Sequence, residues 1–239
     1  MCGRFTLTTN DYIAVARALD ADFVAHADEC RARYNIAPGD EHPIVWLDDG
    51  PHPHRVMRIA RWGMSGADDD RFHINARSET VHSRPAFRDA LCGHRCLVPA
   101  DGFFEWTGDK NNRLPLWFHR PDAKLLVFAG LYRDGIDAKT GEVTRRFTIL
   151  TTRCNDVVAS AHDRMPVILD EEARTAWLEP PPVDIHTWPG VFARMQPLLG
   201  PAPNSTLVAT EVSNRVNKVG NDDASCIAES RHIRQTSLF

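Results

Sequence analysis

Short apolar runs, rich in Val, Ile, Phe and Trp, follow one another along this chain and are broken by Gly, Pro and Asp. Runs of this length and composition are typical of strands. They show no regular alternation with helices, and the chain has no internal repeat. The pattern therefore favours an α+β fold of mostly antiparallel sheets, curled into a barrel-like core with short peripheral helices. We expect strands at 44–47, 56–62, 96–99, 103–106, 116–119, 125–132, 147–151 and 206–212.

Helices are expected in three places. Residues 8–20 combine capping side chains with apolar residues at helical spacing, and residues 155–161 and 171–178 suit short helices. Residues 34–40 contain Pro38-Gly39 and are predicted to turn. No composition shift marks a boundary, so we expect a single domain over 1–225, followed by a loose tail at 226–239.

The composition limits the classes of protein to which the chain can belong. Its 239 residues suit one large domain, and its longest apolar run, Leu125 to Leu131, is too short to span a bilayer. The six cysteines have no framework spacing, which favours reduced thiols and a cytoplasmic protein without membrane attachment. The net charge of −4 disfavours a non-specific polyanion binder. Cys92, His94 and Cys96 offer three soft ligands without a fourth, so we expect no metal site.

Cysteine follows the initiator methionine, and this position allows a reaction that is open to no other residue. Removal of Met1, usual ahead of a small residue, leaves Cys2 with a free α-amine beside its thiol. Both groups titrate near about pH 8, so each has a reactive fraction at neutral pH. The amine can form an imine with an aldehyde, and the thiol can close on the imine carbon to give a thiazolidine. The alternative is a chance small residue in a frayed terminus.

A second candidate is the segment 73–79. If it is extended, Asn75 and Arg77 share one face while Ile74 and Ala76 pack on the other. An amide donor beside a guanidinium suits a sugar or a phosphate. A turn-flanking Asn and a solvated Arg form the alternative.

Two further residues have the character of proton carriers. Glu105 lies among three aromatic residues within 102–106, where desolvation would raise its pKa, unless an ion pair with a neighbouring arginine forms instead. His162 lies on a loop that Pro166 directs into an extended segment, and imidazole titrates close to neutral pH. A purely structural histidine is the alternative.

These segments and several others match the motifs of one protein family, and they occur in the same order along the chain. They are CGRF at 2–5, YNIAP at 34–38, INARSET at 74–80, RCLVPADGFFEW at 95–106 and HDRMPV at 162–167. The chain resembles the SOS response-associated peptidase (SRAP) domain family, whose members process abasic sites in DNA. The resemblance extends from Cys2 to about Asp223 and implies the family's barrel-like fold.

The resemblance also implies a function and a set of site residues. Mature Cys2 would form a thiazolidine crosslink with the ring-opened aldehyde of an abasic site in single-stranded DNA. Met1 would be removed by the protein itself or by an aminopeptidase, the source of the peptidase label. The protein would act as a monomer without cofactor or metal. The implied catalytic residues are Cys2, Asn75, Glu105 and His162, and the implied DNA-binding residues are Arg4, Arg77, Trp106, Thr151 and Arg164.

One departure and two competing functions stay open at this point. Residues 62–72 form a shorter and more acidic loop than is usual in the family, which leaves Met64 or Phe72 as the residue that could wedge into DNA. An N-terminal-cysteine amidase or peptidase would use Cys2 as a nucleophile. A non-covalent single-stranded DNA module would use aromatic side chains such as Trp106 as stacking platforms.

Overall fold

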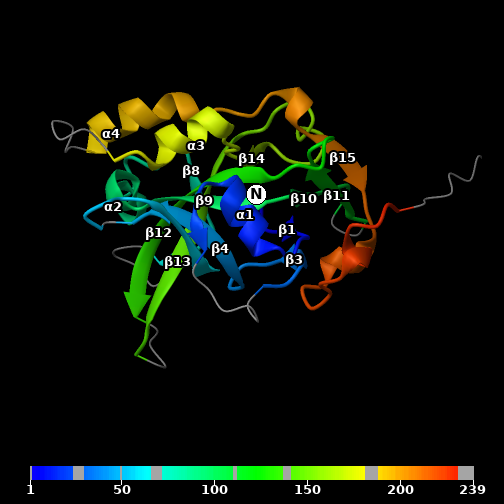
Figure 1. The fold of residues 1–239 in the computed structure, drawn as a ribbon. Coiled ribbons are helices and arrows are strands. Elements are labelled where there is room, and N and C mark those ends of the chain that lie inside the picture. The colour runs from blue at the N-terminus through cyan, green and yellow to red at the C-terminus, as the bar shows by residue number, and fades with distance from the viewer. Residues whose placement is uncertain are drawn as a thin grey trace, which may run out of the picture.

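Five strands close into a barrel at the centre of the computed structural model (Figure 1). In order around the barrel they are β13 (Val143–Arg153), β12 (Leu126–Ile136), β9 (Arg95–Ala100), β4 (Glu41–Leu47) and β5 (Arg55–Trp62). Neighbours pair antiparallel except where β13 meets β5 in parallel and closes the ring. The structure describes residues 2–23, 30–48, 50–65, 72–109, 112–136, 141–180 and 188–230.

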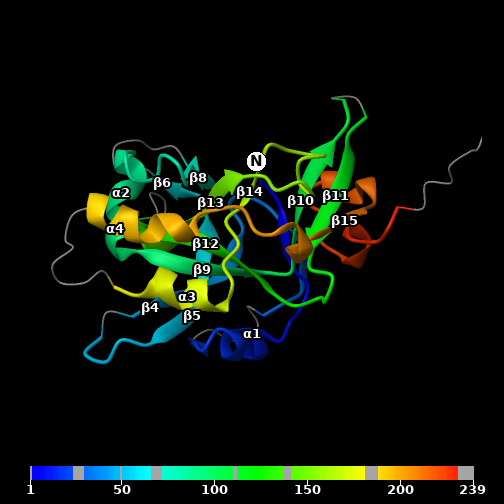
Figure 2. The same ribbon diagram turned by 90° about the horizontal axis from the view of Figure 1, so that it is seen from above.

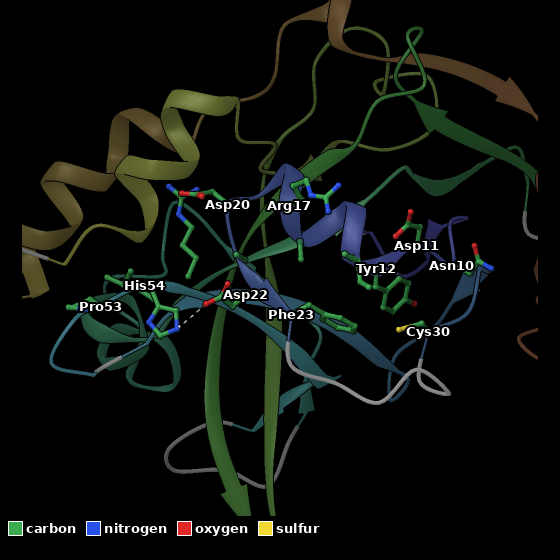
Figure 3. A pocket seen from close by; sticks show the side chains of 15 residues that line it. Asn10, Asp11, Tyr12, Arg17, Asp20, Asp22, Phe23, Cys30, Pro53 and His54 are labelled. Atoms are coloured by element: carbon green, nitrogen blue, oxygen red, sulfur yellow. Dashed lines mark ion pairs between the residues drawn. The ribbon is translucent and has the colours of Figure 1, made fainter.

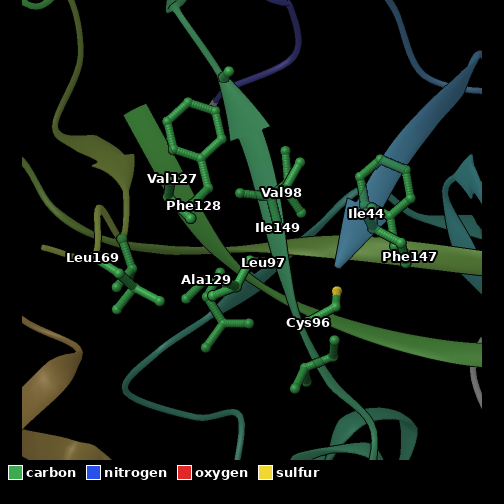
Figure 4. Packing of buried hydrophobic residues seen from close by; sticks show 14 of the residues in the cluster. Ile44, Cys96, Leu97, Val98, Val127, Phe128, Ala129, Phe147, Ile149 and Leu169 are labelled. Atoms are coloured by element: carbon green, nitrogen blue, oxygen red, sulfur yellow. The ribbon is translucent and has the colours of Figure 1, made fainter. Parts of the chain in front are cut away.

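Apolar side chains from all five strands fill the barrel. Val98, Phe128, Phe147 and Ile149 are fully buried and lie within one cluster (Figure 4). At the closing pair, the ring of Trp62 stacks on that of Phe147 with centroids 6.4 Å apart. Burial of large side chains of this kind stabilises each by about 1.5–3 kcal/mol, which is why the apolar runs of the sequence become the barrel strands.

A second sheet packs against the barrel and carries the start of the chain. Its order is β15 (Val208–Glu211), β11 (Leu114–His119), β10 (Gly102–Thr107), β1 (Phe5–Leu7) and β3 (Arg33–Ile36). Phe5 is fully buried, and its ring meets those of His42, Trp62 and Phe128 edge-on. The first strand is therefore fixed both by hydrogen bonds on its two sides and by aromatic packing into the barrel.

Short strands add to the edges of these sheets. β8 (Asn75–Arg77) and β14 (Arg164–Pro166) both pair with β13, and β2 (Asp22–Phe23) pairs with β5. β6 (Met64–Ser65) and β7 (Phe72–His73) pair with each other. Because β8 and β14 meet the same end of β13, the residues at 75–77 and 162–166 come together in space.

The helices are short and lie outside the sheets. α2 (Pro85–Gly93), α3 (Glu171–Leu178) and α4 (Trp188–Met195) lie on one side of the barrel (Figures 1 and 2). Arg55 links α3 to the end of α1 (Tyr12–Ala18), since it donates to both Leu19 O and Thr175 Oγ1. The 3₁₀ helices are η2 (Gln196–Leu198), η3 (Asn204–Thr206), η4 (Asn214–Asn217) and η5 (Ala224–Cys226). None of the helices in the described ranges is long and apolar enough to cross a membrane.

The predicted fold class is confirmed, with local differences. Residues 155–161 form turns and no helix, although the Asn155 side chain caps Val158 N as it would at the start of a helix. Residues 34–36 belong to β3, so the predicted turn is shorter than 34–40. The predicted boundary after residue 225 falls inside packed structure, since Cys226 is fully buried and Ser230 N donates to Glu211 O at 2.9 Å. The rest of the predicted tail, 231–239, lies outside the described residues.

Gly130 offers a test of barrel packing, with Gly135 of the same strand as its control. A Cβ at Gly130 would lie 2.8 Å from Cys96 Sγ and 2.9 Å from Val98 Cγ2, whereas a Cβ at Gly135 would meet nothing within 4 Å. We expect Gly130→Ala to lower the free energy of unfolding by about 1–3 kcal/mol through overpacking, and Gly135→Ala to lower it by less than about 0.5 kcal/mol. Urea denaturation measures both, and equal losses would contradict this account of the packing.

Candidate functional site

The start of the chain continues the pairing of β1 with β10. Phe5 pairs with Phe103, and Phe104 N donates to Arg4 O at 2.9 Å. Because this antiparallel register runs on toward Cys2, the first residues lie alongside the stretch of β10 that contains Glu105. Both views place the start of the chain beside β10 and β14 (Figures 1 and 2).

Cys2 is fully buried at this position, and Asn75 holds its backbone. The Asn75 side-chain Nδ2 donates to Cys2 O at 2.8 Å. Ala76 is buried and Arg77 exposed, as the predicted alternation requires, whereas Ile74 and Asn75 are both half-buried. The Oδ1 atom of Asn75 is buried and accepts no hydrogen bond from any described residue. An acceptor left open beside Cys2 can receive a donor at the chain's amine.

Glu105 is a buried carboxyl, only 3% exposed. Burial raises its pKa to about 7, while the positive charge at the amino terminus opposes the shift. This agrees with the desolvation that its aromatic neighbours suggest. A carboxyl with this pKa is divided between its two protonation states at neutral pH, as a proton carrier requires.

The Cys2 thiol is held in its neutral form. Burial, reinforced by the charge of Glu105, raises its pKa far above the ordinary value for cysteine. Its Sγ atom lies 3.9 Å from Arg4 O, to which it donates a weak hydrogen bond. A neutral thiol is a poor nucleophile, so this site disfavours a reaction that begins with sulfur attack.

His162 is fixed through Nδ1. That atom accepts from Arg164 N at 3.0 Å and lies 2.8 Å from Asp163 Oδ1. Burial and the positive amino terminus lower the pKa of His162. The charge of Glu105 contributes to the raised pKa of Cys2, so these two residues lie near each other, and Asn75 joins them through Cys2 O.

Three of the predicted DNA-binding residues lie on β8, β13 and β14. Arg77 is exposed, and its side chain forms no hydrogen bond or ion pair with any described residue. Thr151 is fully buried, and its hydroxyl accepts from Arg164 Nε at 3.2 Å. Arg164 is also buried and forms a two-pronged ion pair with Glu79, at 2.9 and 3.2 Å. Arg77 therefore faces solvent, while Thr151 and Arg164 face each other inside the fold.

Arg4 and Trp106 form a pair on the other side of Cys2. The Arg4 Cζ atom lies 6.0 Å from the centre of the Trp106 ring. Two asparagines that the sequence analysis did not single out hold this pair. Asn35 Oδ1 accepts from Arg4 Nη1 at 2.8 Å, and Asn217 Oδ1 accepts from Trp106 Nε1 at 2.7 Å. Asn35 lies in the YNIAP motif, which was its only signal, and Asn217 had none.

The two candidate wedge residues differ in exposure. Met64 is fully buried, which leaves its side chain unable to reach a strand, whereas Phe72 is 61% exposed. The Arg146 guanidinium lies 4.5 Å from the Phe72 ring centre. Most of the acidic loop between them, 66–71, lies outside the described residues.

A pocket of about 1160 Å³ opens elsewhere, between α1, β2 and the turn that joins β4 to β5 (Figure 3). Tyr12 and Phe23 line it, and His54 Nε2 lies 3.5 Å from Asp22 Oδ2 at its edge. None of its lining residues belongs to the candidate set. Among the described residues, no group of three or more His, Cys, Asp or Glu could hold a metal ion.

The raised pKa of Glu105 predicts how stability changes with pH. From the ordinary value of 4.5 up to about 7, the folded protein binds more protons than the unfolded chain, so the free energy of unfolding falls as pH rises. Glu105→Gln should remove this fall, which amounts to at most about 3 kcal/mol. Urea denaturation at about pH 5 and pH 8 measures it.

Glu79→Gln is the matched control. Burial favours the neutral form of Glu79, but the hydrogen bonds and charge of Arg164 outweigh burial and lower its pKa. Its contribution is therefore lost only as pH falls below 4.5, and Glu79→Gln should leave the slope between pH 5 and pH 8 unchanged. Equal slopes in wild type and Glu105→Gln would show that the carboxyl is not desolvated.

Known proteins are similar to this chain in sequence and in fold. The sequence model described as SOS response associated peptidase (SRAP) matches residues 1–219. The chain is 34% identical over 233 residues to the abasic site processing protein YoqW of Bacillus subtilis, covering 95% of this chain and 99% of the relative. It is 30% identical to the abasic site processing protein YedK of Escherichia coli, with 74% and 79% covered. A solved structure from Bacteroides thetaiotaomicron superposes with a TM-score of 0.81 at 23% identity, covering 96% of this chain and all of that one. This chain belongs to the SRAP family.

Proposed function

We propose that this protein captures abasic sites in single-stranded DNA as a covalent thiazolidine formed by mature Cys2. The relatives YoqW and YedK are named abasic site processing proteins, which supports this substrate. One observation carries the proposal: the backbone of Cys2 is held by Asn75 at 2.8 Å, next to a buried carboxyl whose pKa is about 7. An abasic site in its open form is an aldehyde, and this arrangement suits an amine that attacks an aldehyde.

Removal of Met1 comes first, because the amide nitrogen that joins Met1 to Cys2 has no nucleophilic lone pair. Hydrolysis of that bond, by the protein itself or by an aminopeptidase, leaves the α-amine on Cys2. Asn75 already holds the Cys2 carbonyl, and its buried Oδ1 can accept from the new amine. The nucleophile is thereby oriented before DNA arrives.

Imine formation requires proton transfers in both directions. The closed sugar opens when a proton is delivered to its ring oxygen and another is removed from the hydroxyl at C1′. His162 delivers the first proton from its imidazolium form, in which Nδ1 donates to Asp163, 2.8 Å away, and Nε2 releases the proton. Glu105, as a carboxylate, removes the proton from the hydroxyl and becomes the acid for the next step. The amine then adds to the aldehyde carbon, and Glu105 protonates the departing hydroxyl, so that one water leaves and the imine forms.

Ring closure uses the thiol second. The Cys2 thiol is neutral, so the amine reacts before sulfur does. The imine nitrogen still carries its proton after water leaves, so Glu105, now a carboxylate, accepts the thiol proton as sulfur bonds to the imine carbon, which gives the neutral thiazolidine and restores the acid form of Glu105. The overall change joins amine, thiol and aldehyde into a thiazolidine with loss of one water. The same buried thiol disfavours a peptidase that starts with a thiolate.

The flanking strand is bound on two sides of Cys2. Exposed Arg77 contacts a phosphate on one side, and Arg4 with Trp106 receives the backbone and a base on the other. Thr151 and Arg164 act indirectly, since their buried bonds hold β14 against the loop that follows β8. Exposed Phe72 is the residue that can insert beside a base.

Replacement of Cys2 tests the covalent step. Cys2→Ser should give an imine that forms only a weaker ring, and Cys2→Ala should leave an imine that borohydride can trap, with no adduct that survives hydrolysis in either case. Cys92→Ser, a change at a partly buried cysteine on α2, should crosslink like the wild type. Intact mass after incubation with an abasic single strand measures each product. A stable adduct in Cys2→Ala would remove Cys2 from the mechanism, and full crosslinking by a protein with a non-cleavable extension before Cys2 would remove the α-amine.

Loss of Arg77 should weaken strand capture through charge. Arg77→Ala removes one phosphate contact, so the slope of log affinity against log salt should become shallower by about 1. Arg58→Ala removes an exposed arginine from β5 and serves as the control, with an expected slope equal to that of the wild type. Fluorescence anisotropy with a single-stranded oligonucleotide at several salt concentrations measures both. An unchanged slope in Arg77→Ala would place this residue outside the strand path.

A further inference from the structure

Asn35 joins the start of the chain to the segment 213–223. Its side chain is 1% exposed. Its Nδ2 atom donates to three backbone carbonyls of that segment, Val216 O and Lys218 O at 3.2 Å and Asn221 O at 2.7 Å. Its Oδ1 atom accepts from Arg4 Nη1 at 2.8 Å. Because both ends of the amide are engaged, its orientation is fixed.

Arg4 is held at one corner of its guanidinium. Nη1 donates to Asn35 Oδ1 and also to Val216 O, at 2.9 Å. Nε and Nη2 form no hydrogen bond with any described residue. Burial lowers the pKa of Arg4, yet a guanidinium keeps its charge at neutral pH. The segment therefore fixes the direction of the cation while leaving donors for another partner.

Trp106 is held by the same segment. Asn217, exposed on η4, accepts from the indole Nε1 at 2.7 Å. This bond fixes the plane of a half-exposed ring whose centre lies 6.0 Å from the Arg4 guanidinium. A ring with a fixed plane loses less conformational freedom when a base stacks on it. Exposed Lys218, the next residue, adds a positive charge to this face.

The segment itself is firmly anchored. Val216 and Cys226 are fully buried in a small cluster with Phe104. Asp222 accepts from Tyr34 N at 2.6 Å and from Asn35 N at 2.9 Å. The segment 213–223 lies beside β11 and β15, on the side of the molecule away from α2 and α4 (Figure 2). The family match ends at residue 219, but Asn221 and Asp222 complete the network that holds Asn35.

We infer that the segment 213–223 is a working part of the strand-binding surface, in which Asn35 and Asn217 are positioning residues that direct Arg4 and Trp106 toward single-stranded DNA. The inference rests on the proposed function, which assigns Arg4 and Trp106 to the strand. It gives the chain's C-terminal region a role in binding that is separate from the chemistry at Cys2.

A double-mutant cycle on Asn217 and Trp106 tests the inference. Asn217→Ala removes the acceptor, Trp106→Phe removes the donor while keeping an aromatic ring, and the double variant removes both. Asn214→Ala, a change at an exposed asparagine in the same 3₁₀ helix, is the matched control. The affinity for an intact single-stranded oligonucleotide is measured by anisotropy, and urea denaturation checks that each variant folds.

We expect Asn217→Ala to bind the strand about five- to tenfold more weakly, because a ring that is no longer held in place loses part of the affinity that one stacked base contributes. Asn214→Ala should bind like the wild type. The effect of Asn217→Ala should vanish in the Trp106→Phe background. Two results would overturn the inference. Asn217→Ala could bind the intact oligonucleotide as tightly as the wild type does, or Asn217→Ala could weaken binding by the same factor in the Trp106→Phe background as in the wild type.

A second readout separates this inference from the proposed function. Mature protein is incubated with a small soluble aldehyde, and the mass of the Cys2 adduct is followed. Asn217→Ala should form this adduct at the rate of the wild type, because positioning acts on the strand alone. A wild type that forms no adduct with abasic DNA would overturn the proposed function, while the affinity for intact strand would still decide the role of Asn217. A slower small-aldehyde reaction in Asn217→Ala would show a general structural effect and contradict a positioning role.

Discussion

The hydrogen bonds between β1 and β10 support the rest of the site. Chain ends usually fray, because a terminal segment gains too little from burial to offset its conformational entropy. Here β1 pairs on both sides, and Phe5 inserts among aromatic rings of the barrel. The terminus is therefore as firmly held as a core strand, and the register places Cys2 beside Glu105 without any loop that could move.

Burial determines the protonation states around this terminus. The same low-polarity surroundings raise the pKa of the Cys2 thiol and of the Glu105 carboxyl. The consequence differs for the two groups, because the thiol is left without charge at neutral pH while the carboxyl is brought into the range where it can exchange protons. In the proposed mechanism this difference sets the order of the steps, because a neutral thiol reacts more slowly than the amine.

The sequence was informative where a pattern has a local cause. The period of two predicted that Ala76 faces inward and Arg77 outward, and the aromatic neighbours of Glu105 predicted its desolvation. α3 matched its predicted bounds, since Asp170 caps it and Pro180 follows its end. α2 was not predicted, although Pro85 at its first turn and apolar residues 87, 90 and 91 carried a signal. The long-range partners of a side chain could not be predicted in this way. Asn35 bonds to residues more than 180 positions away in the sequence, and no local pattern indicates such a contact.

Arg77 and Arg164 show why a motif identifies a residue more readily than its task. Both lie in segments that resemble the family, and both have the chemistry to bind phosphate. Arg164 nevertheless donates its side-chain hydrogen bonds to Glu79 and Thr151 within the fold. The side chain of Arg77, on the other side of β13, donates to none of the described residues. The side chain of Glu79 is 40% exposed, so the ion pair itself contributes at most about 1 kcal/mol, whereas loss of the buried hydrogen bonds from Arg164 to Thr151 costs about 1–3 kcal/mol. A change at Arg164 would thus impair DNA capture by loosening the loop after β8, and stability measurements separate that effect from a lost phosphate contact. In the proposed function, Arg77 is therefore the residue that can contact a phosphate, while buried Arg164 holds the loop after β8 in place.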